Sequence, residues 1–158
     1  WRDCGGRGMI VNGQSLLAAA PLGPMETSKI RCTASGTSYG LSEAGYDVRL
    51  DQDVTLSPAK RFTLASTQER FAMPRNLIGI VHDKSTWARQ GISVFNTVVE
   101  SGWEGWLTLE IVYHGDGEIH LPRGAGIAQV IFHQTTDRAD YGDGKYQGQE
   151  RGPQEART

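Results

Sequence analysis

The segment "KSTWARQG", which begins at Lys84, contains four side chains that could bind an anion. Lys84, Ser85, Thr86 and Arg89 bring an ammonium, two hydroxyls and a guanidinium together. A helical turn capped by Ser85 and ended by Gly91 would put Ser85 and Arg89 on one face. Its first-turn amides would then point outward beside Lys84, forming a compact site that suits phosphate. A solvated turn with surface charges explains the same residues equally well.

A carboxylate that suits proton transfer lies in a second segment, "ESGWEGWLTLEI". Strand alternation places Leu107, Leu109 and Ile111 on one face, and Trp106, Thr108, Glu110 and Val112 on the other. Among these partly apolar neighbours the Glu110 carboxylate would lose hydration, and its pKa would rise from about 4.3 towards neutrality. A glutamate that faces water or pairs with an arginine is the commoner arrangement.

The C-terminal segment "YGDGKYQGQERGPQEAR" carries Lys145, Arg151 and Arg157 among glycines and tyrosines. It has no apolar period from Thr135 onward, which predicts a tail that is disordered or ordered only by a partner or ligand. A flexible basic end is the simplest interpretation. The alternative is a lid that closes over a charged ligand and expels water.

Several enzyme classes are excluded by missing motifs. The chain lacks the P-C-x-x-C and His/Cys-Glu signature of zinc deaminases and the G-x-S-x-G elbow of serine hydrolases. Its four histidines have no ligand-like spacing: His82, His114, His120 and His133. Cys4 and Cys32 are predicted to be free thiols because they fit neither a disulfide framework nor a zinc site.

The elements that must position these groups are mainly strands. "NGQSLLAAAP" predicts one short helix ended by Pro21, and residues 22–44 predict loop with short extended pieces. From residue 45 the period becomes two, and "GYDVRLDQDVTL" predicts a strand with one face in water. Further strands are expected in "FTLAS", "NLIGIVH", "GISVFNTVV", "GWLTLEIVYH", "GEIHLP" and "GIAQVIFH". Short strands at this spacing indicate an all-β barrel or double-sheet fold.

The composition limits the architecture and the partners. With 158 residues, we expect one domain over residues 9–158, and residues 1–8 are interpreted as a cloning remnant or upstream read-through. A net charge of -2 argues against broad nucleic-acid binding. No apolar run approaches the roughly 18 residues of a membrane span. We therefore expect no nucleic-acid or membrane partner and a cytoplasmic location, in the host cytoplasm if the protein is viral.

Five segments in order resemble motifs of the dCTP deaminase and dUTPase superfamily, and more closely those of its deaminase branch. They are "SEAGYDVRL", "DKSTWAR", "ESGWEGWLTLEI", "PRGAGIAQVIF" and the tail segment "GKYQGQERGP". The resemblance spans most of residues 41–157. It implies a distorted jelly-roll-like β barrel, a homotrimer with active sites at subunit interfaces, and a C-terminal lid over residues 135–158.

The implied reaction is hydrolytic, zinc-independent removal of the 4-amino group from dCTP or a 5-substituted dCTP, giving the dUTP product and ammonia. Glu110 matches the family's proton-shuttling glutamate, and Ser85 and Arg89 match residues that position the attacking water. The resemblance implies substrate contacts at Lys84, Thr86, Val98, Glu100, Trp103, Gln129, Tyr141, Lys145 and Gln149. Mg²⁺ would accompany the triphosphate and be held mainly by the nucleotide.

Two departures from the family pattern bear on the substrate. The family motif D-P-G-W begins here with Glu100, whose added methylene changes the reach of the carboxylate at the position that meets the sugar. The segment between Arg89 and Trp103 is also shorter than in the family. The shortening falls beside Thr97, Val98 and Val99, where a backbone carbonyl normally meets the exocyclic amine or the catalytic water.

Other functions fit parts of the same pattern. The first is a dUTP diphosphatase, or a bifunctional enzyme that gives dUMP and pyrophosphate, with Glu100 orienting the water. The second is a nucleotide-binding β module without turnover, since a fold does not determine a function. A virion or carbohydrate-binding jelly roll fits the strand pattern but not the motifs.

Overall fold

The computed structural model describes residues 10–158. The predicted N-terminal remnant and Cys4 lie outside the described residues. Cys32 is a half-buried free thiol, as expected.

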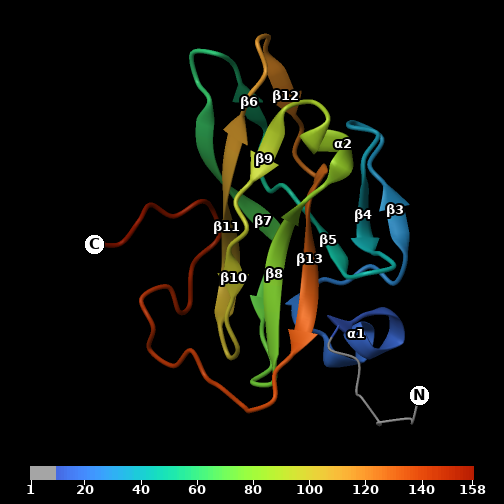
Figure 1. Cartoon of the computed structure of the whole chain (residues 1–158), viewed down its shortest axis with the longest axis vertical. Coiled ribbons are helices and arrows are strands. Elements are labelled where there is room, and N and C mark those ends of the chain that lie inside the picture. Colours follow the sequence, from blue (N-terminus) through green and yellow to red (C-terminus); the bar gives the residue numbers. More distant parts are fainter. Residues whose placement is uncertain (1–9) are drawn as a thin grey trace, which may run out of the picture.

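Two antiparallel sheets contain all but two of the strands (Figure 1). The larger sheet has the order β10-β8-β13-β5-β4-β3, and β1 also pairs with β13. Its strands are β1 (Ile10–Val11), β3 (Lys29–Arg31), β4 (Ser38–Leu41), β5 (Tyr46–Arg49), β8 (Leu77–Asp83), β10 (Val98–Val99) and β13 (Gly126–Gln134). The smaller sheet has the order β2-β7-β11-β9, from β2 (Leu22–Gly23), β7 (Phe62–Ala72), β11 (Glu104–Tyr113) and β9 (Ile92–Val94). A separate pair joins β6 (Val54–Leu56) to β12 (Ile119–Leu121).

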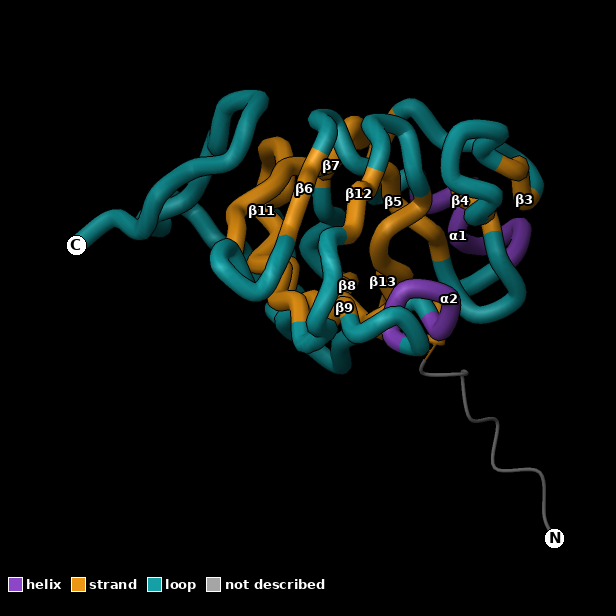
Figure 2. Tube along the Cα trace, turned by 90° about the horizontal axis from the view of Figure 1, so that it is seen from above, coloured by secondary structure: helices purple, strands orange, loops and turns teal. Residues whose placement is uncertain are grey.

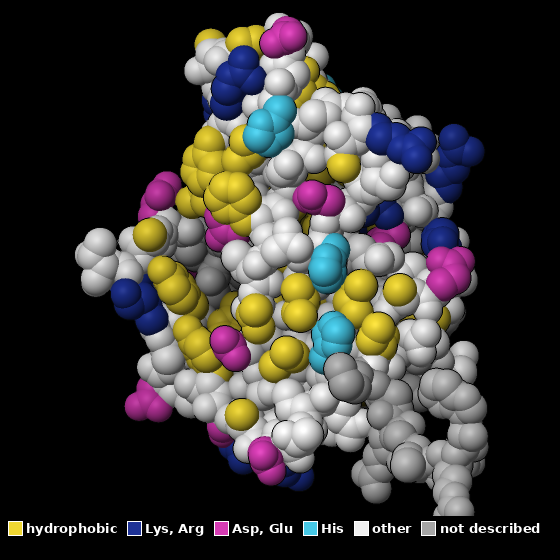
Figure 3. Space-filling model, viewed as in Figure 1, with side chains coloured by type: hydrophobic (Ala, Val, Ile, Leu, Met, Phe, Trp, Pro, Cys, Tyr) yellow, Lys and Arg dark blue, Asp and Glu magenta, His cyan; other side chains and the backbone are white. Residues whose placement is uncertain are grey.

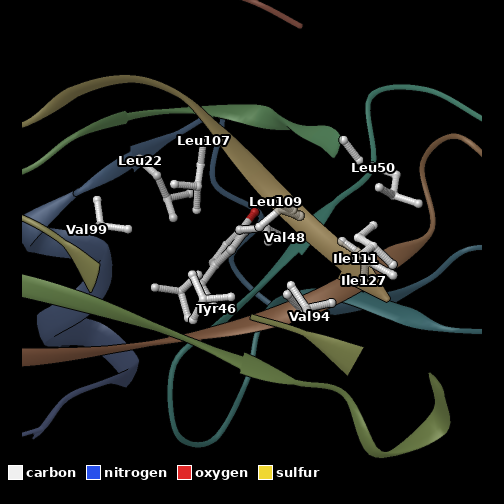
Figure 4. Packing of buried hydrophobic residues seen from close by; sticks show 14 of the residues in the cluster. Leu22, Tyr46, Val48, Leu50, Val94, Val99, Leu107, Leu109, Ile111 and Ile127 are labelled. Atoms are coloured by element: carbon white, nitrogen blue, oxygen red, sulfur yellow. The ribbon is translucent and has the colours of Figure 1, made fainter. Parts of the chain in front are cut away.

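The hydrophobic core lies between strands of both sheets (Figure 4). Leu109 and Ile111 of β11 are fully buried, as are Val48 of β5 and Ile127 of β13. Their burial follows the predicted alternation along β11, in which every second side chain leaves solvent. The prediction of an all-β, jelly-roll-like barrel is confirmed.

The segment 45–56 differs from the predicted single strand. It divides into β5 and β6, and the face expected in water is largely covered by ion pairs. Asp47 is only 2% exposed and pairs with Lys84, while Arg49 pairs with the fully buried Glu69 at 2.7 Å. The charged side chains at alternate positions of this segment therefore contact oppositely charged residues from distant parts of the chain and not solvent.

Both expected helical segments are present. α1 (Gly13–Ala19) ends before Pro21, and α2 (Ser85–Ala88) is a single turn. The prediction that Ser85 caps α2 is wrong: Lys84 occupies the N-cap position, and the structure has no side-chain cap bond there. Gly91 ends the turn as predicted, with φ of +83°. Within residues 10–158, no helix is long and apolar enough to cross a membrane.

The C-terminal tail is ordered by its own chain, contrary to the prediction that only a partner or ligand would order it. It lies beside β11, on the side of the molecule away from α2 (Figures 1 and 2). Backbone bonds from Gly148 N to Glu104 O (3.0 Å) and from Trp106 N to Gln149 O (3.1 Å) attach it. Such backbone pairing needs no apolar period, which explains why the pattern did not reveal it.

We predict that Leu109→Ala destabilises the protein by about 2–5 kcal/mol, because it opens a cavity between the sheets. Val112→Ala, on the opposite face of the same strand, should cost about 1 kcal/mol or less. Urea unfolding of both variants measures the difference. Equal losses would show that the two faces of β11 are not packed as described.

Candidate active site

A cavity of about 520 Å³ lies between β7, β11, the segment around β10 and the C-terminal tail. Its strand and loop lining consists of Phe62, Leu64, Thr97, Val98, Val99, Glu100, Trp103, Leu107, Thr108 and Glu110. The tail contributes Tyr141, Tyr146, Gln149, Gln154, Glu155 and Ala156. The volume suits a small organic ligand, and most of the lining is apolar.

Glu110 is held in this cavity by β-sheet pairing on both sides of its strand. It lies opposite Leu64 of β7, and its carbonyl oxygen accepts a hydrogen bond from Phe95 N at 3.0 Å. Its carboxylate atom Oε2 is buried without a hydrogen-bond partner. Burial raises the pKa of Glu110 above its usual value, which favours proton exchange closer to neutral pH.

The cavity carries acidic groups and no basic ones. Glu100, Glu110 and Glu155 line it, whereas no lysine or arginine from residues 10–158 does. Such a lining accommodates the neutral base and sugar of a nucleotide better than its phosphates. The cations that the sequence predicted for phosphate binding are therefore not part of this lining.

The tail closes one side of the cavity through polar contacts. Gln149 is 5% exposed and donates from Nε2 to Thr108 Oγ1, which also accepts from Gln154 N at 3.0 Å. Trp103 Nε1 donates to Tyr146 O at 2.7 Å. Where the tail crosses β11, Gly105 has φ of +149°, and a Cβ there would lie 2.8 Å from Gln149 N. This close approach explains the glycine.

The structure divides the residues singled out from sequence into two groups. Half of them line the cavity: Glu110, Val98, Glu100, Trp103, Tyr141 and Gln149. The others lie outside its lining: Ser85, Arg89, Lys84, Thr86, Gln129 and Lys145. Ser85, Thr86 and Arg89 are exposed on α2, and Lys145 Nζ donates to Arg157 O at 2.6 Å within the tail.

Lys84 and Gln129 meet in a second polar cluster around Asp47. The Asp47 carboxylate pairs with Lys84 Nζ and accepts from Gln129 Nε2 at 3.0 Å. Gln129 Nε2 also donates to Ser42 Oγ at 2.9 Å. The sequence pattern had placed Asp47 in water, so its part in this cluster was missed.

Other cavity residues were also missed from sequence. Leu107 is buried in the core as predicted, and it also lines the cavity. Phe62 and Leu64 enter from β7. The sequence had pointed to this cavity through Thr108, on the Glu110 face of the strand, and through the segment 97–99.

Comparison with known proteins identifies the family. The dCTP deaminase-like family model matches residues 46–135, which span β5 to β13 and include Glu110. The chain belongs to the dCTP deaminase family. A dCTP deaminase from Leptothrix cholodnii is 35% identical, over 80% of this chain and 85% of that protein. One from Coxiella burnetii is 36% identical over the same shares.

The fold agrees with this family assignment. The native EIAV dUTPase superposes with a TM-score of 0.55 at 22% identity, covering 78% of this chain and 98% of that chain. At this identity the likeness concerns the fold alone. The dUTPase-like fold expected from the motifs is thus confirmed.

The described residues of this dCTP deaminase family member do not form a metal site of their own. Residues 10–158 contain no group of three or more His, Cys, Asp or Glu side chains placed to hold an ion.

We predict that Glu110→Gln stabilises the protein at neutral and alkaline pH. Because burial raises the carboxyl pKa, the folded state binds a proton more tightly than the unfolded state, and stability falls as pH rises through the folded pKa. The amide carries no such penalty. Thermal unfolding should give a higher Tm than the parent at pH 7.5 and no gain below about pH 4, where the unfolded carboxyl is protonated too.

The matched control is the exposed Glu118, whose carboxylate remains in water. Glu118→Gln should change Tm little at either pH. An equal Tm for the parent and Glu110→Gln at pH 7.5 would argue against a desolvated carboxylate.

Proposed function

We propose that this protein is an enzyme that deaminates dCTP, or a 5-substituted dCTP, hydrolytically and without zinc. The observation that carries the proposal is that Glu110 lines a largely apolar cavity and that its Oε2 atom is buried without a hydrogen-bond partner. The names of the two curated relatives support the same substrate class.

In the proposed reaction, Glu110 takes a proton from a water molecule as its oxygen attacks C4 of the pyrimidine. The proton moves to N3, and a tetrahedral intermediate forms. Glu110 takes the second proton of the new hydroxyl and delivers it to the amino group, which leaves as ammonia while a C4 carbonyl forms. A carboxyl group whose pKa is raised towards the working pH suits both transfers.

A second copy of the chain would complete this site. The cavity lining lacks a cation in residues 10–158, while Ser85 and Arg89 are exposed on α2, away from the tail. Phe62 and Val98 line the cavity and remain 51% and 48% exposed, which suits coverage by a neighbouring subunit. Hydrophobic side chains also gather over β8 and β10 (Figure 3).

These features support the proposed homotrimer, in which α2 of one subunit meets Glu110 of the next. Arg89 would then stabilise the charge that develops at the attacked carbon's oxygen, and Ser85 would hold the water. Lys84, Thr86, Gln129 and Lys145 would contact the triphosphate, and Mg²⁺ would accompany it as part of the substrate.

We predict that the parent protein, incubated with dCTP and Mg²⁺, releases ammonia and leaves a triphosphate product. Glu110→Gln should reduce this release by about 10²–10⁴-fold, because the amide cannot transfer protons. Chromatography over a panel of pyrimidine triphosphates measures base change and phosphate loss separately. A Glu110→Gln variant as active as the parent would disprove the proposed role.

A dUTP diphosphatase activity is the second candidate, because Glu100 lines the same cavity and supplies another carboxylate. The same chromatography distinguishes it. Pyrophosphate and dUMP from dUTP would support hydrolysis, and dUMP from dCTP would support a coupled reaction.

We predict that two inactive variants complement each other if the site is shared between subunits. Mixed refolding of Glu110→Gln with Arg89→Ala should restore about a quarter of the sites. Half of the cavities then carry an intact Glu110, and half of these meet a subunit with an intact Arg89. Ammonia release measures the recovery. Arg89→Ala mixed with Ser85→Ala is the control without recovery, because no α2 turn is then intact. No recovery in the first mixture would place both groups in one subunit.

A further inference from the structure

A second buried, unpaired polar atom belongs to a residue that lines the cavity beside Glu110. Among residues 10–158, three buried side-chain polar atoms lack a hydrogen-bond partner: Ser66 Oγ, Thr97 Oγ1 and Glu110 Oε2. Thr97 and Glu110 line the same cavity, whereas Ser66 does not line it. Buried polar groups are nearly always paired, so an unpaired hydroxyl beside an open cavity points to a ligand that pairs it.

The backbone holds Thr97 in a fixed relation to Glu110. Thr97 N donates to Phe95 O at 2.9 Å, and Thr97 O accepts from Val81 N of β8 at 3.1 Å. Phe95 N donates to Glu110 O at 3.0 Å. The short link from β9 to β10 is therefore tied to β11 at Glu110 and to β8 at Val81, which fixes the backbone of Thr97 relative to Glu110.

The surroundings of the Thr97 hydroxyl favour contact with a ligand. Val98 and Val99 follow it in the lining, and neither side chain offers a hydrogen bond. A hydroxyl can donate one hydrogen bond and accept two. It can accept a bond from an amino group and donate one to a carbonyl oxygen at the same place.

We propose that the Thr97 hydroxyl is a second ligand-contacting group, which hydrogen-bonds the C4 substituent of the pyrimidine while Glu110 activates the water. This inference rests on the proposed function. Thr97 accepts from the 4-amino group of the substrate and donates to the 4-oxo group of the product, so the contact persists through the reaction. It orients C4 towards the water, and its loss lowers turnover more than substrate affinity.

Three variants test this contact. Thr97→Val keeps the shape and removes the hydroxyl, and we expect kcat to fall by about 10- to 100-fold with little change in KM. Its Tm should equal or exceed that of the parent, because an unpaired buried hydroxyl is removed. Thr97→Ser should retain kcat within about threefold of the parent, since it restores the hydroxyl.

Ser66→Ala is the matched control, because it removes a buried unpaired hydroxyl that does not line the cavity. It should leave kcat unchanged. The inference is overturned if Thr97→Val turns over within about twofold of the parent, or if Ser66→Ala loses as much activity as Thr97→Val.

A binding measurement separates this inference from the proposed function. If the parent deaminates no pyrimidine triphosphate, the proposed function fails. Calorimetry with dCTP then tests whether the Thr97 hydroxyl contacts the nucleotide. A less favourable binding enthalpy for Thr97→Val than for the parent and for Ser66→Ala supports the contact, even where the dissociation constants are similar. Equal binding enthalpies, or no binding by the parent, reject it.

Discussion

The carboxylate of Glu110 is the constraint on which the candidate site depends, because it is buried in a largely apolar cavity without a bond to Oε2. β11 makes this arrangement possible. Its alternate face packs Leu109 and Ile111 into the core, so the strand cannot move to relieve the carboxylate without opening the space between the sheets. The packing of the core thus holds the Glu110 carboxylate in a poorly hydrated position, and this loss of hydration raises its pKa.

The raised pKa of Glu110 also depends on the absence of basic side chains from the described lining of the cavity. An arginine inside the cavity would neutralise Glu110 and lower its pKa. In residues 10–158 the cavity instead has only acidic charges, and Lys84 is held at Asp47 together with Gln129. In the single subunit, therefore, no basic group of the described lining offsets the effect of burial, and the pKa of Glu110 stays raised.

Local patterns in the sequence predicted much of the fold, because alternation and turn residues act over a few positions. They located the β11 faces, the helix before Pro21 and the turn ended by Gly91. They failed where a distant segment decides the environment. Asp47 is shielded from water because Lys84 and Gln129 bind its carboxylate. The tail is ordered because its backbone pairs with β11. The role assigned to Glu110 came from motif resemblance, whereas the unpaired atom of Thr97 required three-dimensional packing.

The tail lines one side of the cavity, so its contacts determine how readily that side opens. The tail is attached up to Arg151, which binds Asp51 through two bonds of 2.7 Å, and Gln149 is buried against β11. Beyond Gly152, the cavity-lining residues 154–156 are attached to β11 through the bond from Gln154 N to Thr108 Oγ1. Arg157 adds three hydrogen bonds to Lys145 and Tyr146. Displacing the distal part breaks these bonds and the one to Thr108, whereas releasing the whole tail would also expose Gln149 and break the ion pair. Opening the distal part alone therefore costs less, and it leaves Trp103 and Gln149 in place around the cavity.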